Sequence, residues 1–337
     1  YSSASFDYKK WFYLDLTARN DWSSTLPSNN WSFFYPSATM SWIASDLFKF
    51  DPKIVSFAKL RASWAQVGNA TDAYQLAMTY TSSDPYDGTT PFRLPTTMPA
   101  LNLKPESITS TEVGAELKFF QNRFGLNVTY YDKVAKDQIM DIDISDASGY
   151  DKMKINAGEI ENKGVELELQ GQILKSERGL NWNVAVNWAK NKNQVNKIYS
   201  DLKKYQIASS WGSVTIEAIP GEAFGVIKAV GFKTDDKGNV IVGSNGIPLS
   251  TATPIEVGNV MPKWTGGINN SFEYRNFNAS FLIDMRWGGS VFSVTDWFGG
   301  MSGVSEETAQ TASRAGTNGK NIREVGLVVG QDVLKDR

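Results

Sequence analysis

Hydrophobic and polar residues alternate with a period of two along stretches of about ten residues. Over residues 181–191, the apolar face is made of Trp182, Val184, Val186 and Trp188. Residues 277–288 repeat the pattern, with an apolar face made of Phe277, Ala279, Phe281, Ile283, Met285 and Trp287. Successive side chains of a β-strand point to opposite faces of a sheet, so this period predicts strands.

Other segments show the same alternation, and aromatic residues end the apolar face of most of them. The predicted strands cover residues 11–19, 33–43, 57–67, 109–120, 123–133, 163–174, 180–190, 263–274 and 277–288. The strands of a soluble β-sandwich, which is the alternative, are about half as long. Spans with one apolar face and aromatic ends are typical of membrane barrels. We therefore predict an all-β fold, a transmembrane antiparallel β-barrel.

The connections between the predicted strands alternate between short and long. Short turns lie at residues 7–10, 121–122, 175–179 and 275–276, and long segments at 68–108, 134–162, 191–262 and from 289 onward. Outer-membrane barrels have short periplasmic turns and long extracellular loops, which this sorting matches. The connection 44–56 is the longer exception on the short side, and we expect a helical turn in it. Smaller strands are predicted at 214–219, 225–232 and 239–242.

The ends of the chain suggest part of a longer protein. No signal peptide and no initiator methionine precede Tyr1, although an exported barrel needs such a signal. Residues 1–10 are expected to form the end of a strand and a turn. We assign residues 1–300 to a partial transmembrane barrel of about ten strands and residues 301–337 to an extracellular loop segment.

Composition removes most classes of enzyme. The chain contains no cysteine and no histidine, which excludes disulfides, thiolate and Ser-His-Asp catalysis, and histidine-bound zinc. Its net charge of −2 argues against nucleic-acid binding, which needs basic clusters. No run of apolar residues is long enough for a membrane-spanning helix. We therefore predict neither catalytic residues nor a metal or cofactor.

The polar faces of the strands carry the candidate lumen-lining residues. These are Glu112, Glu116, Glu166, Glu168, Asn187, Asp284 and Arg286. Paired carboxylates also occur in glycosidases. A hydrated polar wall is the favoured interpretation, because unpaired carboxylates buried between two sheets would be costly.

The opposite faces carry the candidate lipid-facing residues, and the long loops carry exposed aromatics. The lipid-facing set is Trp182, Val184, Val186, Trp188, Phe281, Ile283 and Trp287. Trp211, Trp297 and Phe298 lie in predicted loops, where they would contact a substrate or a lid, or pack the loops. Exposed aromatic rings of this kind can stack on sugar rings or on peptide side chains.

Two acidic segments raise the question of a loop calcium ion. Asp235 and Asp236 lie in the sequence TDDKGNV, which lacks the twelfth-position glutamate of a calcium loop. A β-turn is the favoured interpretation. Asp141, Asp143 and Asp146 form a second cluster, which we interpret as a solvated edge strand.

Several segments together resemble one family, the SusC/RagA-like TonB-linked outer-membrane transporters. The matching segments are residues 11–27, 33–46, 59–75, 103–139, 155–169 and 266–289. The pieces LRASWAQVGN and NAGEIENKGVELEL are the most specific, and all segments stand in the expected order.

The resemblance implies a barrel of about 22 strands with an N-terminal plug. It implies the outer membrane of a Gram-negative bacterium, TonB-driven import of oligosaccharides or peptides, a SusD-like surface lipoprotein as a lid, and a dimer of transporter–lid pairs. The plug, the TonB box and the remaining strands are absent from this sequence. A passive channel or porin and a barrel-based adhesin are the alternatives. A barrel enzyme has poor candidate residues without histidine.

Overall fold

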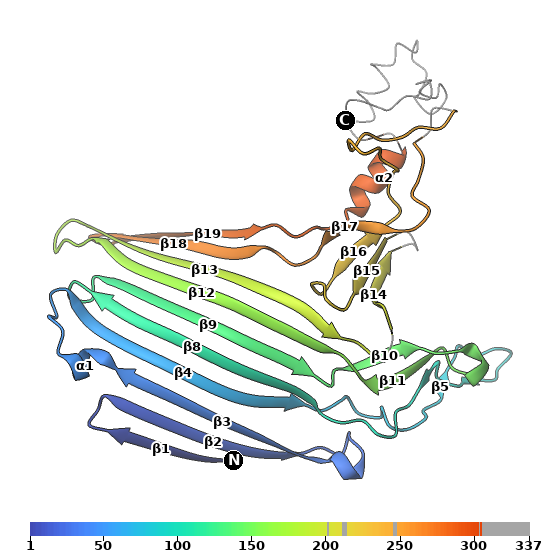
Figure 1. The fold of residues 1–337 in the computed structure, drawn as a ribbon, viewed down its shortest axis with the longest axis horizontal. Coiled ribbons are helices and arrows are strands. Elements are labelled where there is room, and N and C mark those ends of the chain that lie inside the picture. Colours follow the sequence, from blue (N-terminus) through green and yellow to red (C-terminus); the bar gives the residue numbers. More distant parts are fainter. Residues whose placement is uncertain (201, 211–213, 245–247, 303, 305–337) are drawn as a thin grey trace. The chain divides into compact units, whose positions relative to one another are not determined.

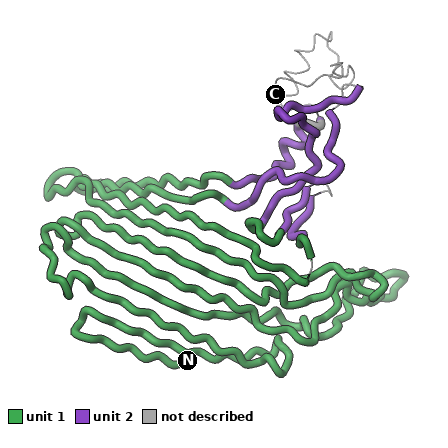
Figure 2. Tube along the Cα trace, in the orientation of Figure 1, with its two compact units in different colours: residues 1–205, 218–224, 262–288 green, residues 206–217, 225–261, 289–337 purple. Residues whose placement is uncertain are grey.

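This computed structural model describes residues 1–200, 202–210, 214–244, 248–302 and 304. The chain divides into two compact units (Figure 2). Unit 1 contains Tyr1–Tyr205, Ala218–Phe224 and Pro262–Gly288. Unit 2 contains the described residues of Gln206–Glu217, Gly225–Met261 and the segment from Gly289. In the described residues, no helix is long and apolar enough to cross a membrane.

Unit 1 is built on a ten-stranded sheet in which every neighbouring pair is antiparallel (Figure 1). In spatial order the strands are β1 (Ser2–Tyr8), β2 (Phe12–Trp22), β3 (Ser32–Ile43), β4 (Val55–Asn69), β8 (Glu106–Phe119), β9 (Phe124–Lys136), β12 (Glu159–Leu174), β13 (Leu180–Lys197), β18 (Trp264–Tyr274) and β19 (Phe277–Trp287). Every strand predicted from residue 11 to residue 190 and from 263 to 288 is confirmed, and several are longer than predicted.

The connections of this sheet sort by length as the sequence predicts. Short turns join β1 to β2, β8 to β9, β12 to β13 and β18 to β19 at one end of the sheet (Figure 1). Turn residues take left-handed backbone angles, for example φ of 58° at Gln121 and 55° at Arg275. The expected helical turn is α1 (Ala44–Phe48), at the same end. The long connections lie at the opposite end.

A second, smaller sheet in unit 1 is formed by the long connections. It pairs β10 (Ile139–Asp143) with β11 (Lys152–Asn156) and β11 with β7 (Thr97–Met98). The prediction of an edge strand is confirmed only in part: Asp141 and Asp143 lie on β10, an edge strand, whereas Asp146 begins a short 3-10 helix (Asp146–Ser148). Asp141 forms a 2.7 Å ion pair with Lys154.

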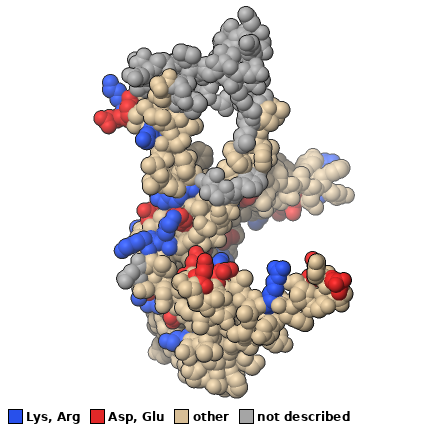
Figure 3. All heavy atoms as spheres, turned by 90° about the vertical axis from the view of Figure 1, so that its right-hand side faces the viewer, with Lys and Arg blue, Asp and Glu red and all other residues tan. Residues whose placement is uncertain are grey.

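Polar contacts tie these connections to the large sheet. Asn156 accepts a hydrogen bond from the Lys104 backbone N–H and donates to the carbonyl oxygens of Lys104 and Asp137. The carboxylate of Glu106 accepts from the backbone N–H of Ile139. Figure 3 looks onto this side of the chain and shows basic side chains beside acidic ones.

Little of unit 1 is buried in a core, as expected for a single curved sheet. Val195, Ile198 and Ala218 form a small apolar cluster at the loop end of β13, with Tyr205 and Phe224 packed against it. Leu26 and Leu103 are also buried, each 1% exposed. Most apolar side chains of the sheet therefore remain open on one face.

Unit 2 holds most of a further four-stranded sheet and one helix. The sheet has the order β14 (Tyr205–Ser210), β15 (Val214–Ala218), β16 (Val226–Ala229) and β17 (Ile255–Asn259). It confirms the small strands predicted near 214–219 and 225–232. The strand predicted at 239–242 is wrong, because Val240 and Val242 form only isolated bridges. The segment after 289 contains α2 (Val294–Ser302) rather than only loop.

A tight turn closes around Asp235, as the turn interpretation predicts. Its carboxylate accepts hydrogen bonds from the backbone N–H groups of Lys237 and Asn239 and from the Asn239 side-chain amide. The Gly238 N–H donates to the Asp235 carbonyl oxygen. These bonds, led by those from Asn239, hold the Asp235 pKa below its ordinary value of 3.8. The carboxylate oxygens are thus occupied within the turn.

We expect this turn to open when Asp235 is protonated. A carboxyl group whose pKa is lowered by folding stabilises the fold above its unfolded pKa, and that contribution is lost as the pH falls through the folded pKa. The amide chemical shifts of Lys237 and Asn239 should therefore hold steady down to about pH 4 and change below it. NMR on the full-length protein checks this. Asp236→Asn should keep this pH-dependent change and Asp235→Ala should remove it. The same pH dependence in both variants would show that Asp235 does not control the turn.

Candidate functional site

The candidate site is the polar face of the ten-stranded sheet, where the register aligns side chains into rows across neighbouring strands. The first row runs Lys59, Glu116, Asn127, Glu168, Asn187, Gly267 and Asp284, each directly opposite the next. The second row runs Arg61, Gly114, Thr129, Glu166, Ala189, Thr265 and Arg286. Neighbouring strands are about 5 Å apart, so members of a row lie side by side.

All the predicted lumen-lining residues fall on this one face. Glu112 lies in a third row, between Ser63 and Tyr131. The register thus brings together residues that are far apart in the sequence. That this face lines a lumen stays a prediction.

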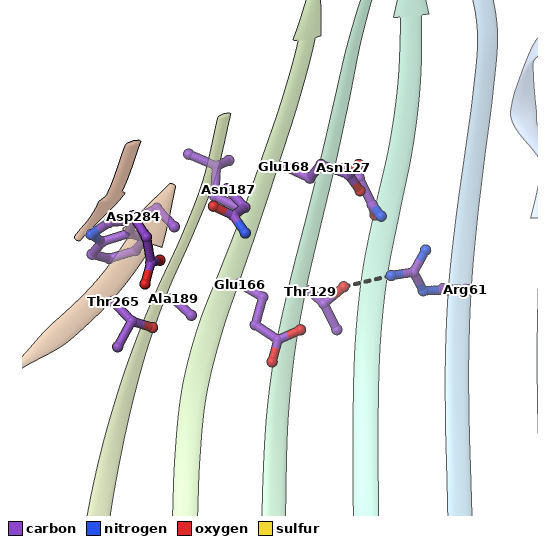
Figure 4. Close-up of a pocket in the computed structure, with 12 residues that line it drawn as sticks. Arg61, Asn127, Thr129, Glu166, Glu168, Asn187, Ala189, Thr265 and Asp284 are labelled. Carbon is purple, nitrogen blue, oxygen red and sulfur yellow. Dashed lines mark hydrogen bonds between the residues drawn. The ribbon is translucent and has the colours of Figure 1, made fainter. Parts of the chain in front are cut away.

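A pocket of about 440 Å³ is hollowed into the polar face (Figure 4). It is lined by residues of both rows, including Glu166, Glu168, Asn187 and Asp284 of the predicted set. Arg61, Asn127 and Thr129 also line it and were missed by the sequence analysis. The available signal was their alternation, for example in the run Lys59, Arg61, Ser63 on β4.

Arg61 reaches across a neighbouring strand to its partner. Its Nη2 donates to the Thr129 hydroxyl at 2.5 Å, which spans from β4 over β8 to β9 (Figure 4). The path lies over Gly114, where an added Cβ would stand 2.8 Å from Arg61 Nε and 2.9 Å from Cζ. Gly114 therefore gives the guanidinium the room to lie flat against the sheet. Thr129 is only 8% exposed beneath it.

The pocket carries more negative than positive charge. Glu166, Glu168 and Asp284 all line it, whereas Arg61 is its one cationic lining residue in the part of the chain that the structure describes. Outside the pocket, ion pairs compensate the carboxylates: Glu116 lies 3.3 Å from Lys118, and Glu112 lies 3.3 Å from Lys133.

The chemistry of the pocket is that of recognition. Carboxylates and amides accept hydrogen bonds from ammonium, amide and hydroxyl groups, and the guanidinium donates to carboxylate or carbonyl oxygens. No group of acidic residues in the described segments is arranged to hold a metal ion.

A second groove of about 390 Å³ lies nearer the short turns. It is lined by polar side chains such as Lys118, Gln170 and Asn183. Arg123 closes this end by donating to the carbonyl oxygens of Gln172 and Ile173 at 2.9 and 2.7 Å. The polar character of the face therefore continues from the middle of the strands to the short turns.

The opposite face of the sheet carries the predicted lipid-facing residues. Trp182 stacks on Phe272 towards the short turns, with ring centroids 5.6 Å apart, and Trp264 stacks on Trp287 towards the loop end at 6.3 Å. Aliphatic side chains such as Val186 lie between these stacks. The arrangement agrees with two aromatic girdles around an apolar band.

The predicted loop aromatics have a different setting from the one expected. Trp297 and Phe298 lie in helix α2 and not in a loop. Their ring centroids are 5.0 Å apart, and Phe292 packs against Trp297 at 6.2 Å. The sequence analysis missed the helix because it treated the segment after 289 as one connection. Trp211 lies outside the described residues.

The long antiparallel strands and the two contrasting faces define a membrane β-barrel domain. The family described as TonB dependent receptor-like, beta-barrel matches residues 1–321, and the chain belongs to this family. It is a family of receptors in the outer membrane of Gram-negative bacteria and not of enzymes. The predicted fold class, membrane and family are thereby confirmed.

Two curated relatives come from Formosa agariphila. TonB-dependent receptor P3 is 26% identical over 322 residues, covering 88% of this chain and 32% of the relative. TonB-dependent receptor P26 is 25% identical over 313 residues, covering 86% of this chain and 32% of the relative. This chain therefore spans about a third of the length of these relatives.

A solved structure of the RagAB peptide transporter matches the same fold. Its TM-score is 0.69 with 22% sequence identity, and the match covers 83% of this chain and 32% of that chain. A structure of the RagAB peptide importer in the "open-open" state also has a TM-score of 0.69, at 21% identity. At this identity the likeness establishes the fold.

We expect Gly114→Ala to displace Arg61 from Thr129. The new Cβ would overlap the guanidinium, so the free energy of unfolding should fall by about 1 kcal/mol, the value of one hydrogen bond. The matched control is Gly125→Ala, where the nearest atom to an added Cβ is 3.8 Å away. Urea unfolding of the full-length protein in detergent measures both.

A double-mutant cycle isolates the cause of this loss. If Gly114 acts through the guanidinium, Gly114→Ala should cost clearly less in an Arg61→Ala background, because the only close contact left to the new Cβ among those described is the Val128 carbonyl oxygen at 3.0 Å. A cost for Gly114→Ala that is the same with and without Arg61 would contradict this role for the glycine.

Proposed function

We propose that this chain is part of the barrel of a TonB-dependent transporter that imports large nutrients across the outer membrane. The observation that carries the proposal is that the two faces of one sheet differ sharply in polarity. One face is apolar and ends in aromatic stacks, and the other is a continuous polar wall with a carboxylate-lined pocket. In a closed barrel, such a sheet places the apolar face in lipid and the polar face in the lumen.

Peptides are the substrate class that we favour, with oligosaccharides as the alternative. The likeness to the RagAB peptide transporter supports peptides. The pocket supports them too, since Glu166 and Asp284 suit ammonium and amide donors while Arg61 suits a carboxylate. Oligosaccharide hydroxyls would also bond to this wall, but they offer no charge to the guanidinium.

The proposed partners follow from the family. One is TonB, which would supply energy through parts of the protein outside this chain. The other is a SusD-like surface lipoprotein, which would form a lid; the likeness to the RagAB peptide transporter supports this partner. A dimer of transporter–lid pairs completes the proposed assembly.

Uptake by cells that carry the full-length protein tests the proposal. Fluorescent peptides and oligosaccharides should enter only when TonB is present, and the protein should co-purify with a surface lipoprotein in mild detergent. The double variant Glu166→Gln with Glu168→Gln should lower peptide uptake several-fold. The matched control is Glu177→Gln, because this residue lies in the short turn between β12 and β13.

Two results would contradict the proposed function. Entry of the substrates without TonB would indicate a passive channel. Uptake that is unchanged in the Glu166 and Glu168 double variant would remove the pocket from the substrate path.

A pair of arginine substitutions tests which face meets lipid. Val186→Arg places a charge in the middle of the apolar band and should cost about 2–4 kcal/mol of folding free energy. Asn187→Arg places the same charge on the polar face and should be tolerated. Heat-modifiable migration of the full-length barrel in gels measures assembly. Normal assembly of Val186→Arg together with failure of Asn187→Arg would show that the faces are reversed.

A further inference from the structure

Lysine side chains gather where the apolar face ends on the loop side. Lys190 and Lys192 follow Trp188 on β13 at intervals of two residues, so all three side chains share the apolar face. Both lysines are exposed. Lys163 of β12 lies directly opposite Lys192 in the register. The end of the apolar face therefore carries three lysines on these two strands, with Glu161 beside Lys163 on the same face of β12.

The three lysines differ in whether a carboxylate compensates their charge. Lys163 lies 2.8 Å from a carboxylate oxygen of Glu161 and 3.3 Å from one of Asp132. Lys190 and Lys192 form no ion pair with any residue that the structure describes. Like charges directly opposite each other on neighbouring strands are unfavourable. Glu161 and Asp132 already balance Lys163, so the ammonium groups left for an external anion are those of Lys190 and Lys192.

Aromatic rings mark the level at which these lysines lie. The stacked pair Trp264 and Trp287 lies at the loop end of the same face. The last paired residues of β13 and β18 are Ala189 and Thr265. One residue further along each strand, Trp264 lies across from Lys190. Tryptophans of this kind lie at the headgroup level, and lysines beside them extend their ammonium groups into the headgroups.

We propose that Lys190 and Lys192 bind the phosphate of a phosphorylated glycolipid in the outer leaflet. This rests on the proposed orientation of the apolar face towards lipid. A phosphate carries up to two negative charges and several acceptor oxygens, so one group can serve both ammonium ions. Lipid phosphates are the anions available at this depth, and juxtamembrane lysines attract them. The site anchors this part of the barrel wall to the lipid around it.

Binding of a defined lipid to the full-length protein tests the site. The probe is a bis-phosphorylated lipid A, titrated into the detergent-solubilised protein and followed by native mass spectrometry. The double variant Lys190→Gln with Lys192→Gln should bind it about 25-fold more weakly, because a loss of roughly five-fold for each lysine multiplies. The dephosphorylated lipid should bind weakly to the wild type and the variant alike.

The matched control is Lys136→Gln. Lys136 is also exposed at the loop end, at an apolar-face position of β9, but it is ion-paired with Glu159 at 3.5 Å. This variant should keep wild-type affinity for the phosphorylated lipid. Heat-modifiable migration confirms that each variant is assembled before its affinity is compared.

Different outcomes separate this inference from the proposed function. Equal lipid affinity of wild type and the Lys190 and Lys192 double variant, with normal uptake, would overturn the lipid site alone. Equal loss in Lys136→Gln would also overturn it, because the effect would then be one of general charge. Normal assembly of Val186→Arg together with failure of Asn187→Arg would overturn the orientation on which the site rests. Competition by millimolar inorganic phosphate with no lipid preference would show a simple anion site instead.

Discussion

The hydrogen-bond ladder of the ten-stranded sheet is the constraint on which the rest of the structure depends. Backbone N–H and C=O groups in a hydrocarbon environment find no water, so neighbouring strands must satisfy them. The ladder continues without a break across the ten strands of the large sheet, from β1 at one edge to β19 at the other. With the backbone fixed in this way, side chains alternate strictly between two faces. A sequence that alternates apolar and polar residues then produces two surfaces with opposite solvent preference.

The same ladder converts local alternation into a site. Glu116 and Asp284 lie about half of the chain apart in sequence, yet an unbroken row of directly opposed residues joins them. A shift of one residue in any strand would move its carboxylates to the apolar face. The polar wall is therefore a property of the register, and the short turns at Gln121 and Arg275 help to set it by holding adjacent strands together.

The sequence carried enough information to predict the strands, the sorting of the connections and the face of each candidate residue, because all three depend on a period of two. It did not reveal Arg61, whose role depends on Thr129 two strands away and on the space over Gly114. The segment 239–242 was wrongly predicted as a strand, because alternation is present but its residues find only isolated bridge partners. Helix α2 was missed for a related reason: nine residues within a long connection give little periodic signal.

Glycines lie within the strands of this sheet, whereas two of its short turns do without glycine. In the short turns a positive φ is carried by Gln121 and Arg275 instead of glycine, whereas Gly114 and Gly164 lie within strands, where glycine normally weakens a sheet. Each is covered by a side chain from an adjacent strand: Arg61 lies over Gly114, and Tyr131 Cζ lies only 2.5 Å from where a Cβ of Gly164 would stand. The cost of the missing side chain is offset by the packing of its neighbour. These glycines allow large polar groups to lie along the wall instead of projecting from it.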